Sequence, residues 1–400
     1  METLPPEIRR ILDSVPALIE KTFPMPGRFR SGLPSQIAEL SGLLTGARGD
    51  RSLSYLSRPN FLSAYLRYFL PWNLYRLCRL LANIDIPLCA EDTIADLGSG
   101  PLTFVSALWI ARPDLRPIPL EFHCIDRSAP ALEAGEKLFN ALRECGAENT
   151  PWQIRLVRED IDIRRTNVTR KGKKAALVCA VNLFNELYEK LPHNNGEALK
   201  RVTADIARIM HNYASESALL LTAEPGVPQS GRFISFLRSA FLEMGRPPLS
   251  PCTHSAACPL LPRKNKWCHF AFETGDVSKD LHRLSAAAKL PKERLVFSYL
   301  LAGHVSHNAV QTPPSVAASG ARTSGARTLD ARTLCVRVIS DAFALPDRRF
   351  GRYGCCACGL VLLAGSKSRV ESIVPASLLT LAFAEDGPRD AKSGALIIEL

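Results

Sequence analysis

The chain has 400 residues, of which 46% are hydrophobic and 22% charged, so it can bury a large core, and a mainly disordered or collagen-like protein is excluded. No run of about 18 uninterrupted apolar residues occurs, which argues against a membrane-spanning helix. The formal net charge of +11 favours a polyanionic partner, RNA or DNA first, with solvated surface charge as the alternative.

The N-terminal residues METLPPEIRRILDSVP carry Glu2 and Glu7 and no apolar segment, unlike a secretory signal or a transit peptide. We therefore expect a reducing compartment, the cytoplasm of a bacterium or the mitochondrion if the chain is eukaryotic. Residues 1–90 carry apolar side chains at helical spacing and predict a helical N-terminal lobe. Leu62, Leu66 and Phe69 fall on one helical face, and Pro71 breaks or restarts that helix.

From 91 to 248 short apolar runs alternate with helical segments, which is typical of a parallel sheet covered by helices on both faces. The strand candidates are 93–97, 119–125, 154–157, 175–183 and 217–223. Residues 249–302 form a Cys-rich segment, and 303–333 a low-complexity linker that we expect to be mobile. Residues 334–400 predict a small β-rich C-terminal unit.

A nucleotide-binding corner is predicted where the first strand meets the following helix. Asp96, Gly98, Ser99 and Gly100 occupy this turn, where glycines allow close backbone approach and the helix N-terminus supplies free N–H donors. Asp126 ends the second strand, where a carboxylate can accept both hydroxyls of a ribose. The third glycine of the dinucleotide pattern is absent, and an acid two residues before the first glycine suits S-adenosylmethionine (SAM) instead.

No catalytic residue is predicted. The fourth strand leads into Asn182-Leu-Phe-Asn185-Glu186 rather than the Asn/Asp-Pro-Pro-aromatic motif that grips a base amino group. The sequence thus predicts an α/β protein with the Rossmann-like fold of SAM-dependent methyltransferases. To this fold it adds a helical N-terminal lobe, a Cys-rich metal-binding insertion and a small β-rich C-terminal unit.

Seven of the twelve cysteines lie after residue 250. Cys252, Cys258 and Cys268 fall within seventeen positions, and Cys355, Cys356 and Cys358 are the evident source of a fourth thiolate. In a reducing compartment such a set binds a soft metal, and four thiolates suit either zinc or a [4Fe–4S] cluster.

The segments that surround these cysteines resemble the mitochondrial small-ribosomal-subunit assembly methyltransferase-like family and its bacterial relatives. The resemblance is carried by AEPGVPQSGRFISFLR, PCTH, ACPL, WCHF and KLPKERLVFSYLL. It implies a SAM-methyltransferase fold, association with the small ribosomal subunit or its precursor, and an iron–sulfur cluster. The implied cluster ligands are Cys252, Cys258, Cys268 and, counting from Gly351, Cys358. Leu102 stands where many members have a third glycine.

Basic side chains gather in three places along the chain. They are Arg164, Arg165, Arg170, Lys171, Lys173 and Lys174, then Arg263, Lys264 and Lys266, then Arg348, Arg349 and Arg352. Such groups suit phosphates, and Trp267 or Phe350 can stack on unpaired bases. We expect a monomer that binds small-subunit rRNA or the ribosomal particle and no membrane. Three functions stay open: an rRNA methyltransferase, a non-catalytic assembly factor that uses SAM and the cluster structurally, and, third, a small-molecule methyltransferase.

Overall fold

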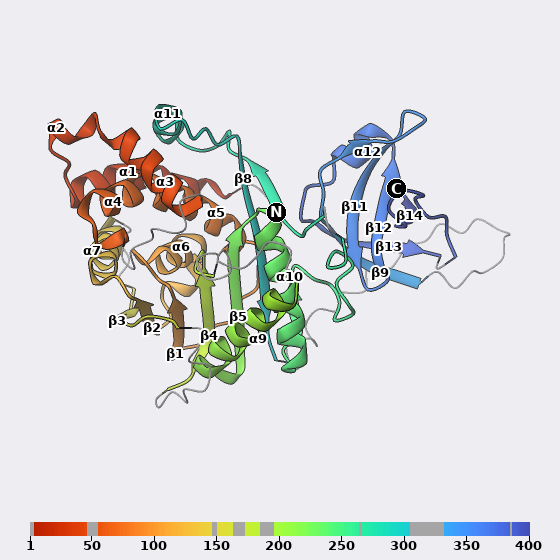
Figure 1. The fold of residues 1–400 in the computed structure, drawn as a ribbon, viewed down its shortest axis with the longest axis horizontal. Coiled ribbons are helices and arrows are strands. Elements are labelled where there is room, and N and C mark those ends of the chain that lie inside the picture. The colour runs from red at the N-terminus through yellow and green to blue at the C-terminus, as the bar shows by residue number, and fades with distance from the viewer. Residues whose placement is uncertain are drawn as a thin grey trace.

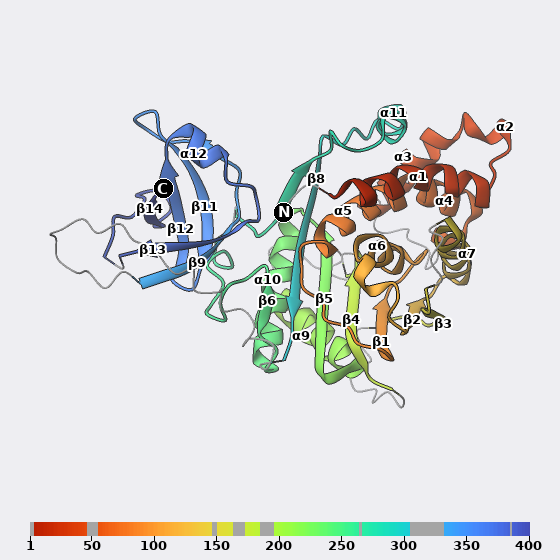
Figure 2. The same cartoon turned by 180° about the vertical axis from the view of Figure 1, so that it is seen from behind.

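The computed structural model describes residues 4–45, 55–145, 150–162, 173–184, 196–263, 266–304, 332–384 and 386–400. These residues form a helical lobe, a large mixed sheet with helices on both faces, and a second, smaller sheet at the C-terminus (Figure 1). The second sheet lies at the opposite end of the molecule from the first helices, and the large sheet stands between them (Figures 1 and 2). No helix within these ranges is long and apolar enough to cross a membrane.

The N-terminal lobe is helical, as predicted. Its helices are α1 (Pro6–Thr22), α2 (Gly27–Arg30), α3 (Leu33–Thr45), α4 (Pro59–Ala64) and α5 (Leu70–Leu81), with a 3₁₀ turn at Tyr55–Ser57. Helix α1 forms because its apolar residues recur at helical spacing, and Ile8, Leu12, Val15 and Ile19 are all buried. A π-helical turn, Tyr65–Phe69, joins α4 to α5 in one continuous helical run, so Pro71 lies inside that run, directly after the widened turn.

The large sheet contains every strand predicted between 91 and 248. Its strands are β1 (Asp92–Leu97), β2 (Leu120–Asp126), β3 (Gln153–Arg158), β4 (Ala175–Val181), β5 (Ala214–Pro225), β6 (Pro248–Ser250), β7 (Phe270–Glu273) and β8 (Arg294–Ala302). The order is β3-β2-β1-β4-β5-β8-β6, with β7 also paired to β8. The first five are parallel and follow a doubly wound order, which confirms the α/β prediction, while β8 runs antiparallel to β5. Strand β8 lies inside the segment assigned from sequence to the Cys-rich unit, so that segment contributes to the large sheet.

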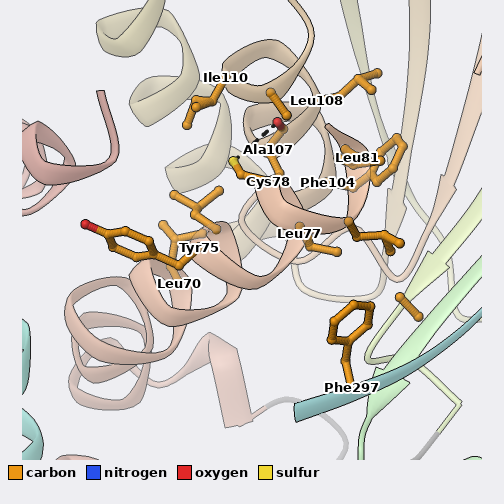
Figure 3. Close-up of a cluster of buried hydrophobic side chains, with 14 of the residues drawn as sticks. Leu70, Tyr75, Leu77, Cys78, Leu81, Phe104, Ala107, Leu108, Ile110 and Phe297 are labelled. Atoms are coloured by element: carbon orange, nitrogen blue, oxygen red, sulfur yellow. Dashed lines mark hydrogen bonds between the residues drawn. The ribbon is translucent and has the colours of Figure 1, made fainter. Parts of the chain in front are cut away.

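Helices cover both faces of this sheet. The crossover helices are α6 (Thr103–Ala111), α7 (Ala129–Cys145), α9 (Gly196–Tyr213) and α10 (Pro228–Glu243). One apolar core lies under α5, α6 and α7 and another under α9 and α10. Figure 3 shows the first core, where Cys78 of α5 donates to the carbonyl of Ala107 in α6 at 3.6 Å. Cys78 is therefore a small buried hydrophobe with a weak donor, as its apolar sequence context predicts.

The C-terminal unit is a second sheet with its own apolar core. Its elements are β9 (Arg332–Val338), β10 (Phe343–Ala344), β11 (Phe350–Cys356), β12 (Gly359–Gly365), α12 (Lys367–Glu371), β13 (Leu378–Phe383) and β14 (Leu396–Glu399). The strand order is β13-β9-β11-β12-β14, with β10 on β11. Arg294 of β8 forms a bidentate pair with Asp341 at 2.8 Å for both contacts, which ties this unit to the large sheet. Most of the predicted linker, residues 305–331, lies outside the described residues.

Candidate functional site

A pocket opens where the parallel strands β1, β2 and β4 end. It is lined by the β1–α6 turn, the end of β2, residues 159–161 after β3 and residues 181–183 after β4. All five residues predicted to bind a cofactor line it, namely Asp96, Gly98, Ser99, Gly100 and Asp126. The carboxyl ends of strands in a doubly wound sheet are where ligands bind in such folds, so the pocket lies at the expected place.

The glycine turn needs its glycines for two different reasons. Gly98 has a φ of +70°, and a Cβ there would lie 2.6 Å from the Leu183 side chain. Gly100 has a φ of +52° with open space beside it, so its requirement is backbone conformation alone. The turn is fixed to β2 because Gly98 and Ser99 both donate their N–H groups to the carbonyl of Ile125, at 2.9 and 3.0 Å.

Leu102 follows the turn in a left-handed conformation, with a φ of +54°. A leucine in that region costs roughly 1–2 kcal/mol that a glycine would not. The buried Leu102 side chain is packed in the core, which offsets this cost. Gly135 of α7 lies against the same loop so closely that a Cβ there would be 2.3 Å from the carbonyl carbon of Pro101. The backbone shape of the third-glycine position is thus retained with a leucine.

The Asp126 carboxylate connects the end of β2 to the glycine turn. Its Oδ2 accepts the Gly100 N–H at 2.9 Å, and its Oδ1 accepts the Ser128 N–H at 2.8 Å. Both oxygens are thereby held at the pocket wall, and each carboxylate oxygen has a second lone pair that can accept a ligand hydroxyl.

Asp96 is 1% exposed and lies at the bottom of the pocket. Ser99 Oγ donates to its Oδ2 at 2.5 Å, and Cys179 Sγ donates to its Oδ1 at 3.4 Å. Burial raises the pKa of Asp96 to about 6, and the nearby Asp126 charge adds to this, while the two hydrogen bonds oppose it. A buried carboxylate with a raised pKa stabilises positive charge in a ligand, and in this position it is poorly placed to act as a general base toward a large substrate.

Several pocket residues carry no signal in the sequence. Tyr55, Leu56 and Tyr65 come from the helical lobe and close one side of the pocket. Only tertiary packing of that lobe on the sheet brings them there.

At the end of β4, Asn182 has a φ of +54° and donates its N–H to the Ala223 carbonyl at 2.8 Å. Asn185 and Glu186, the other polar residues noted there, lie outside the described residues.

The cysteines form a second candidate site, between α10 and the C-terminal sheet. Burial raises the pKa of the Cys268 thiol, and the neighbouring thiols of Cys252, Cys258 and Cys355 raise it further, so these four sulfur atoms lie near one another. Cys358 is exposed in the turn between β11 and β12, and Cys355 of β11 takes the place expected for it beside the other three. Within the described ranges no three His, Cys, Asp or Glu side chains are arranged to hold a metal ion.

Two arginines, one from α10 and one from β9, hold the Cys-rich segment. Arg238 of α10 is 3% exposed and donates to the carbonyls of His254 and Ala256, both at 2.7 Å. Arg337 of β9 donates to the carbonyl of Pro251 at 3.0 Å. Both guanidinium groups lower the pKa of Cys252 against the raising effect of burial. The cluster of four thiols therefore has fixed positive charge beside it, which suits thiolate ligands.

The basic residues expected on an RNA-binding surface differ in their burial and in the groups that they contact. Arg352 is 6% exposed and donates to the carbonyls of Val370 and Ser340, so it supports the C-terminal sheet. Arg349 pairs with Glu399, and Lys266 lies 3.7 Å from the centre of the Tyr353 ring. Trp267 packs on α10 and donates Nε1–H to the Gly226 carbonyl at 2.9 Å. Residues 164–171 and Lys264 lie outside the described part of the chain.

Comparison with protein families identifies a match over much of the chain. The model of the family described as mitochondrial small ribosomal subunit Rsm22 matches residues 62–334, which is more than half of the chain. The matched range includes the glycine turn, the pocket strands and the first three clustered cysteines. No curated protein matches the chain in sequence.

Solved structures of methyltransferases are similar to parts of the chain at low identity. Geranyl diphosphate methyltransferase, bound to geranyl diphosphate and sinefungin, is 12% identical over 75% of this chain and 100% of its own, with a TM-score of 0.30. A SAM-dependent methyltransferase from Geobacter sulfurreducens, bound to S-adenosylhomocysteine, is 10% identical over 66% of this chain and 97% of its own, with a TM-score of 0.32. Mitomycin 7-O-methyltransferase MmcR is 15% identical over 61% of this chain and 70% of its own, with a TM-score of 0.33. The fold of this chain is established by the strand order of its own sheet.

Proposed function

This chain belongs to the family of the mitochondrial small ribosomal subunit protein Rsm22, and from that premise we propose that it is a SAM-binding, methyltransferase-like protein that binds rRNA of the small ribosomal subunit or its precursor. The observation that carries the proposal is the pocket at the carboxyl ends of β1, β2 and β4. Its site of action is the bacterial cytoplasm or, in a eukaryote, the mitochondrion.

SAM has three parts that the pocket residues suit. The Asp126 carboxylate accepts ribose hydroxyls, the glycine turn lets the ligand approach the backbone, and the buried Asp96 favours the cationic methionine end. When bound, SAM supplies an electrophilic methyl group. The residues of this chain orient the ligand, and Tyr55 and Tyr65 reduce access of water from the side of the helical lobe.

A non-catalytic assembly factor is the second candidate, and the end of β4 favours it. The Asn/Asp-Pro-Pro-aromatic motif is absent there, and Asp96 is buried while Asp126 accepts backbone N–H groups with both oxygens. Glu159 and Asp160 are the other described carboxylates of the pocket. Incubation with methyl-labelled SAM and small-subunit precursor rRNA separates the two candidates. Label in the rRNA, lost in Asp96→Ala, supports an enzyme. SAM binding without transfer supports the assembly factor, and no SAM binding contradicts both.

Binding to rRNA is expected to be sensitive to salt and tolerant of sequence. Several Lys and Arg contacts with phosphates release counterions, so affinity should fall by orders of magnitude between about 50 and 200 mM salt. The net charge of +11 supports this expectation. A flat salt response would mean that the charge serves solubility only.

We further propose that Cys252, Cys258, Cys268 and Cys355 hold a [4Fe–4S] cluster, with zinc as the alternative. The donor set is supported by four half-buried thiols that lie near one another beside Arg238 and Arg337, which offset thiolate charge, and a bound metal would draw these thiols together. Iron content and absorbance near 400 nm of anaerobically purified protein, expected at about four irons per chain, test the choice of metal. Colourless protein with one zinc per chain would favour zinc.

Cys355→Ser and Cys358→Ser provide a matched pair. The two thiols lie in the same segment, but only Cys355 lies beside the other three. Loss of metal in Cys355→Ser and its retention in Cys358→Ser is the expected result. The reverse pattern would restore Cys358 as the fourth ligand, and full metal content in both variants would contradict a four-cysteine site that includes either.

A further inference from the structure

Three charged side chains lie behind the pocket and take no part in the glycine turn or the cysteine cluster. Arg76 comes from α5, Glu224 from β5, and Lys292 from the segment that leads into β8. Helix α5 contacts β8, and β8 pairs with β5, so the three elements meet at the centre of the molecule (Figure 1). Nothing in the sequence singles these residues out, because they are far apart along the chain.

A chain of hydrogen bonds connects Arg76 to the pocket wall. Tyr65 lines the pocket, and its Oη accepts from Asn73 Nδ2 at 3.4 Å. Arg76 Nη1 donates to Asn73 Oδ1 at 3.2 Å. Tyr65 also begins the π-helical turn that ends at Phe69, and such turns recur at functional sites because they alter the register of a helix.

Glu224 connects the same group to the end of β4. It is 1% exposed, and its Oε1 accepts the N–H of Phe184 at 2.9 Å, two residues after Asn182 of the pocket. Burial lowers the pKa of Arg76 to about 10, and the charge of Glu224 is among the effects that oppose this. Glu224 therefore partly compensates Arg76 while it fixes the backbone that follows β4.

Positive charge exceeds negative charge at this place. Lys292 is half-buried, with Nζ 5.9 Å from the centre of the Tyr68 ring, and burial together with repulsion from Arg76 lowers its pKa to about 8. Among the described residues neither Arg76 nor Lys292 has an ion-pair partner, and Arg76 Nε is buried without a hydrogen-bond partner. Two nearby cations that a single carboxylate compensates only in part are costly until a further anion compensates them.

We propose that Arg76 and Lys292 form an anion-binding subsite that takes a phosphate of the RNA strand, beside the side of the pocket formed by Tyr65 and the end of β4. The inference rests on the proposed function and extends it by naming the part of the RNA bound there. A guanidinium and an ammonium group at one place suit a phosphate, which offers several oxygens to both. A nucleotide whose phosphate is held there brings its base toward Tyr65 and Asn182 on the pocket wall.

The test measures the affinity of a single-stranded RNA of about ten nucleotides at several salt concentrations. Arg76→Gln and Lys292→Gln should each reduce affinity about tenfold and lower the salt slope by about one. The fold-loss of affinity in the double variant should be smaller than the product of the two single fold-losses, because both side chains contact one phosphate. Arg76→Lys and Lys292→Arg should retain most of the affinity, and thermal unfolding confirms that each variant is folded. Arg283→Gln is the matched control, since Arg283 is a 79% exposed cation on α11 (Lys279–Ala287).

A second experiment uses inorganic phosphate alone and does not depend on RNA. The pKa of Lys292 is measured by NMR of its side chain. Phosphate should raise this pKa in the wild type and leave it unchanged in Arg76→Gln. If the wild type binds RNA but Arg76→Gln and Lys292→Gln lose no more than Arg283→Gln, the subsite is refuted while the proposed function stands. If the wild type binds no RNA, the proposed function fails, and an unchanged pKa of Lys292 in phosphate then refutes the subsite as well.

Discussion

Asp96→Asn should stabilise the ligand-free protein at neutral pH, although it removes a residue that we place in the SAM pocket. Asp96 is 1% exposed, and burial raises its pKa from 3.8 to about 6. An acid whose pKa is higher in the folded state binds more protons when folded than when unfolded. Stability is then lost as the pH rises through this range. Asparagine carries no charge at this position. Its side chain can accept a hydrogen bond from one neighbouring group and donate one to Ser99 Oγ.

The magnitude follows from the two pKa values. A rise from 3.8 to about 6 corresponds to roughly 3 kcal/mol of unfolding free energy, at about 1.4 kcal/mol for each pKa unit. Near pH 4 Asp96 is mostly protonated in the folded state, so the two proteins differ only by the change of hydrogen bonds. Above pH 6 the wild type carries the full cost of a buried carboxylate. The unfolded state is already half ionised near pH 4, so the stability of Asp96→Asn relative to the wild type should increase by roughly 2 kcal/mol between pH 4 and 7.5.

Denaturant unfolding of both proteins between pH 4 and 7.5, without ligand, measures this difference. Asp114→Asn is the control, because its hydrogen bonds with Arg112 lower the pKa of Asp114, so that Asp114 is largely ionised above pH 4 in both the folded and the unfolded state. The stability of that variant relative to the wild type should therefore stay nearly constant between pH 4 and 7.5. A stability difference between Asp96→Asn and the wild type that stays constant across the range would refute the reasoning, since it would mean that Asp96 titrates alike in both states.

Three further substitutions test the packing around the two sites. Gly98→Val should abolish SAM binding, measured by calorimetry, because valine disfavours the positive φ and its Cβ would lie 2.6 Å from Leu183. Gly135→Ala should weaken SAM binding by at least tenfold, because its Cβ would displace the turn before α6, and unchanged affinity would contradict this. Gly231→Ala should displace Trp267, since its Cβ would lie 2.5 Å from the indole, and a red shift of tryptophan emission with reduced metal content is the expected readout.

The glycine turn could be predicted from sequence because its determinants are local. Asp96, Gly98 and Gly100 lie within five residues of one another, and the strand before them and the helix after them are both strongly apolar. The parallel arrangement of the first five strands follows from their alternation with helices, whereas their order in the sheet does not. Strand β8 cannot be paired from sequence, because it pairs with β5 across the whole Cys-rich segment and its apolar run carries no sign of its partner.

The position of the fourth clustered cysteine depends on strand register, which a count along the sequence does not contain. Side chains of a strand alternate between its two faces, so Tyr353 and Cys355 of β11 share one face and Cys356 points to the other, into the C-terminal core. Lys266 lies against Tyr353, which places that face toward the Cys-rich segment. Cys358 comes after the strand, in the turn, where this alternation no longer applies. The register of β11, which depends on pairing with β12 and β9, decides which thiol meets the others.

Arg76, Glu224 and Lys292 show a different limit of sequence reasoning. A lone charged residue is usually at the surface, and only the packing of α5 against β8, the neighbour of β5, brings the buried Glu224 together with the half-buried Arg76 and Lys292. Burying ionised groups without full compensation lowers stability, and a fold without a use for them would gain by replacing them with apolar residues. Their position beside the pocket therefore argues for a role in binding.

Strand β5 connects the two candidate sites, which gives the Cys-rich segment a structural effect on the pocket. Ser298 of β8 lies opposite Glu224 in the strand register and donates its hydroxyl to the Cys268 carbonyl at 2.7 Å. Trp267 donates to the carbonyl of Gly226, two residues after Glu224. The segment that bears the thiols is thus bound to the ends of β5 and β8, and Glu224 in turn holds the backbone after β4. A metal that fixes the segment also fixes these strand ends, so it stabilises one wall of the pocket without contacting a ligand there.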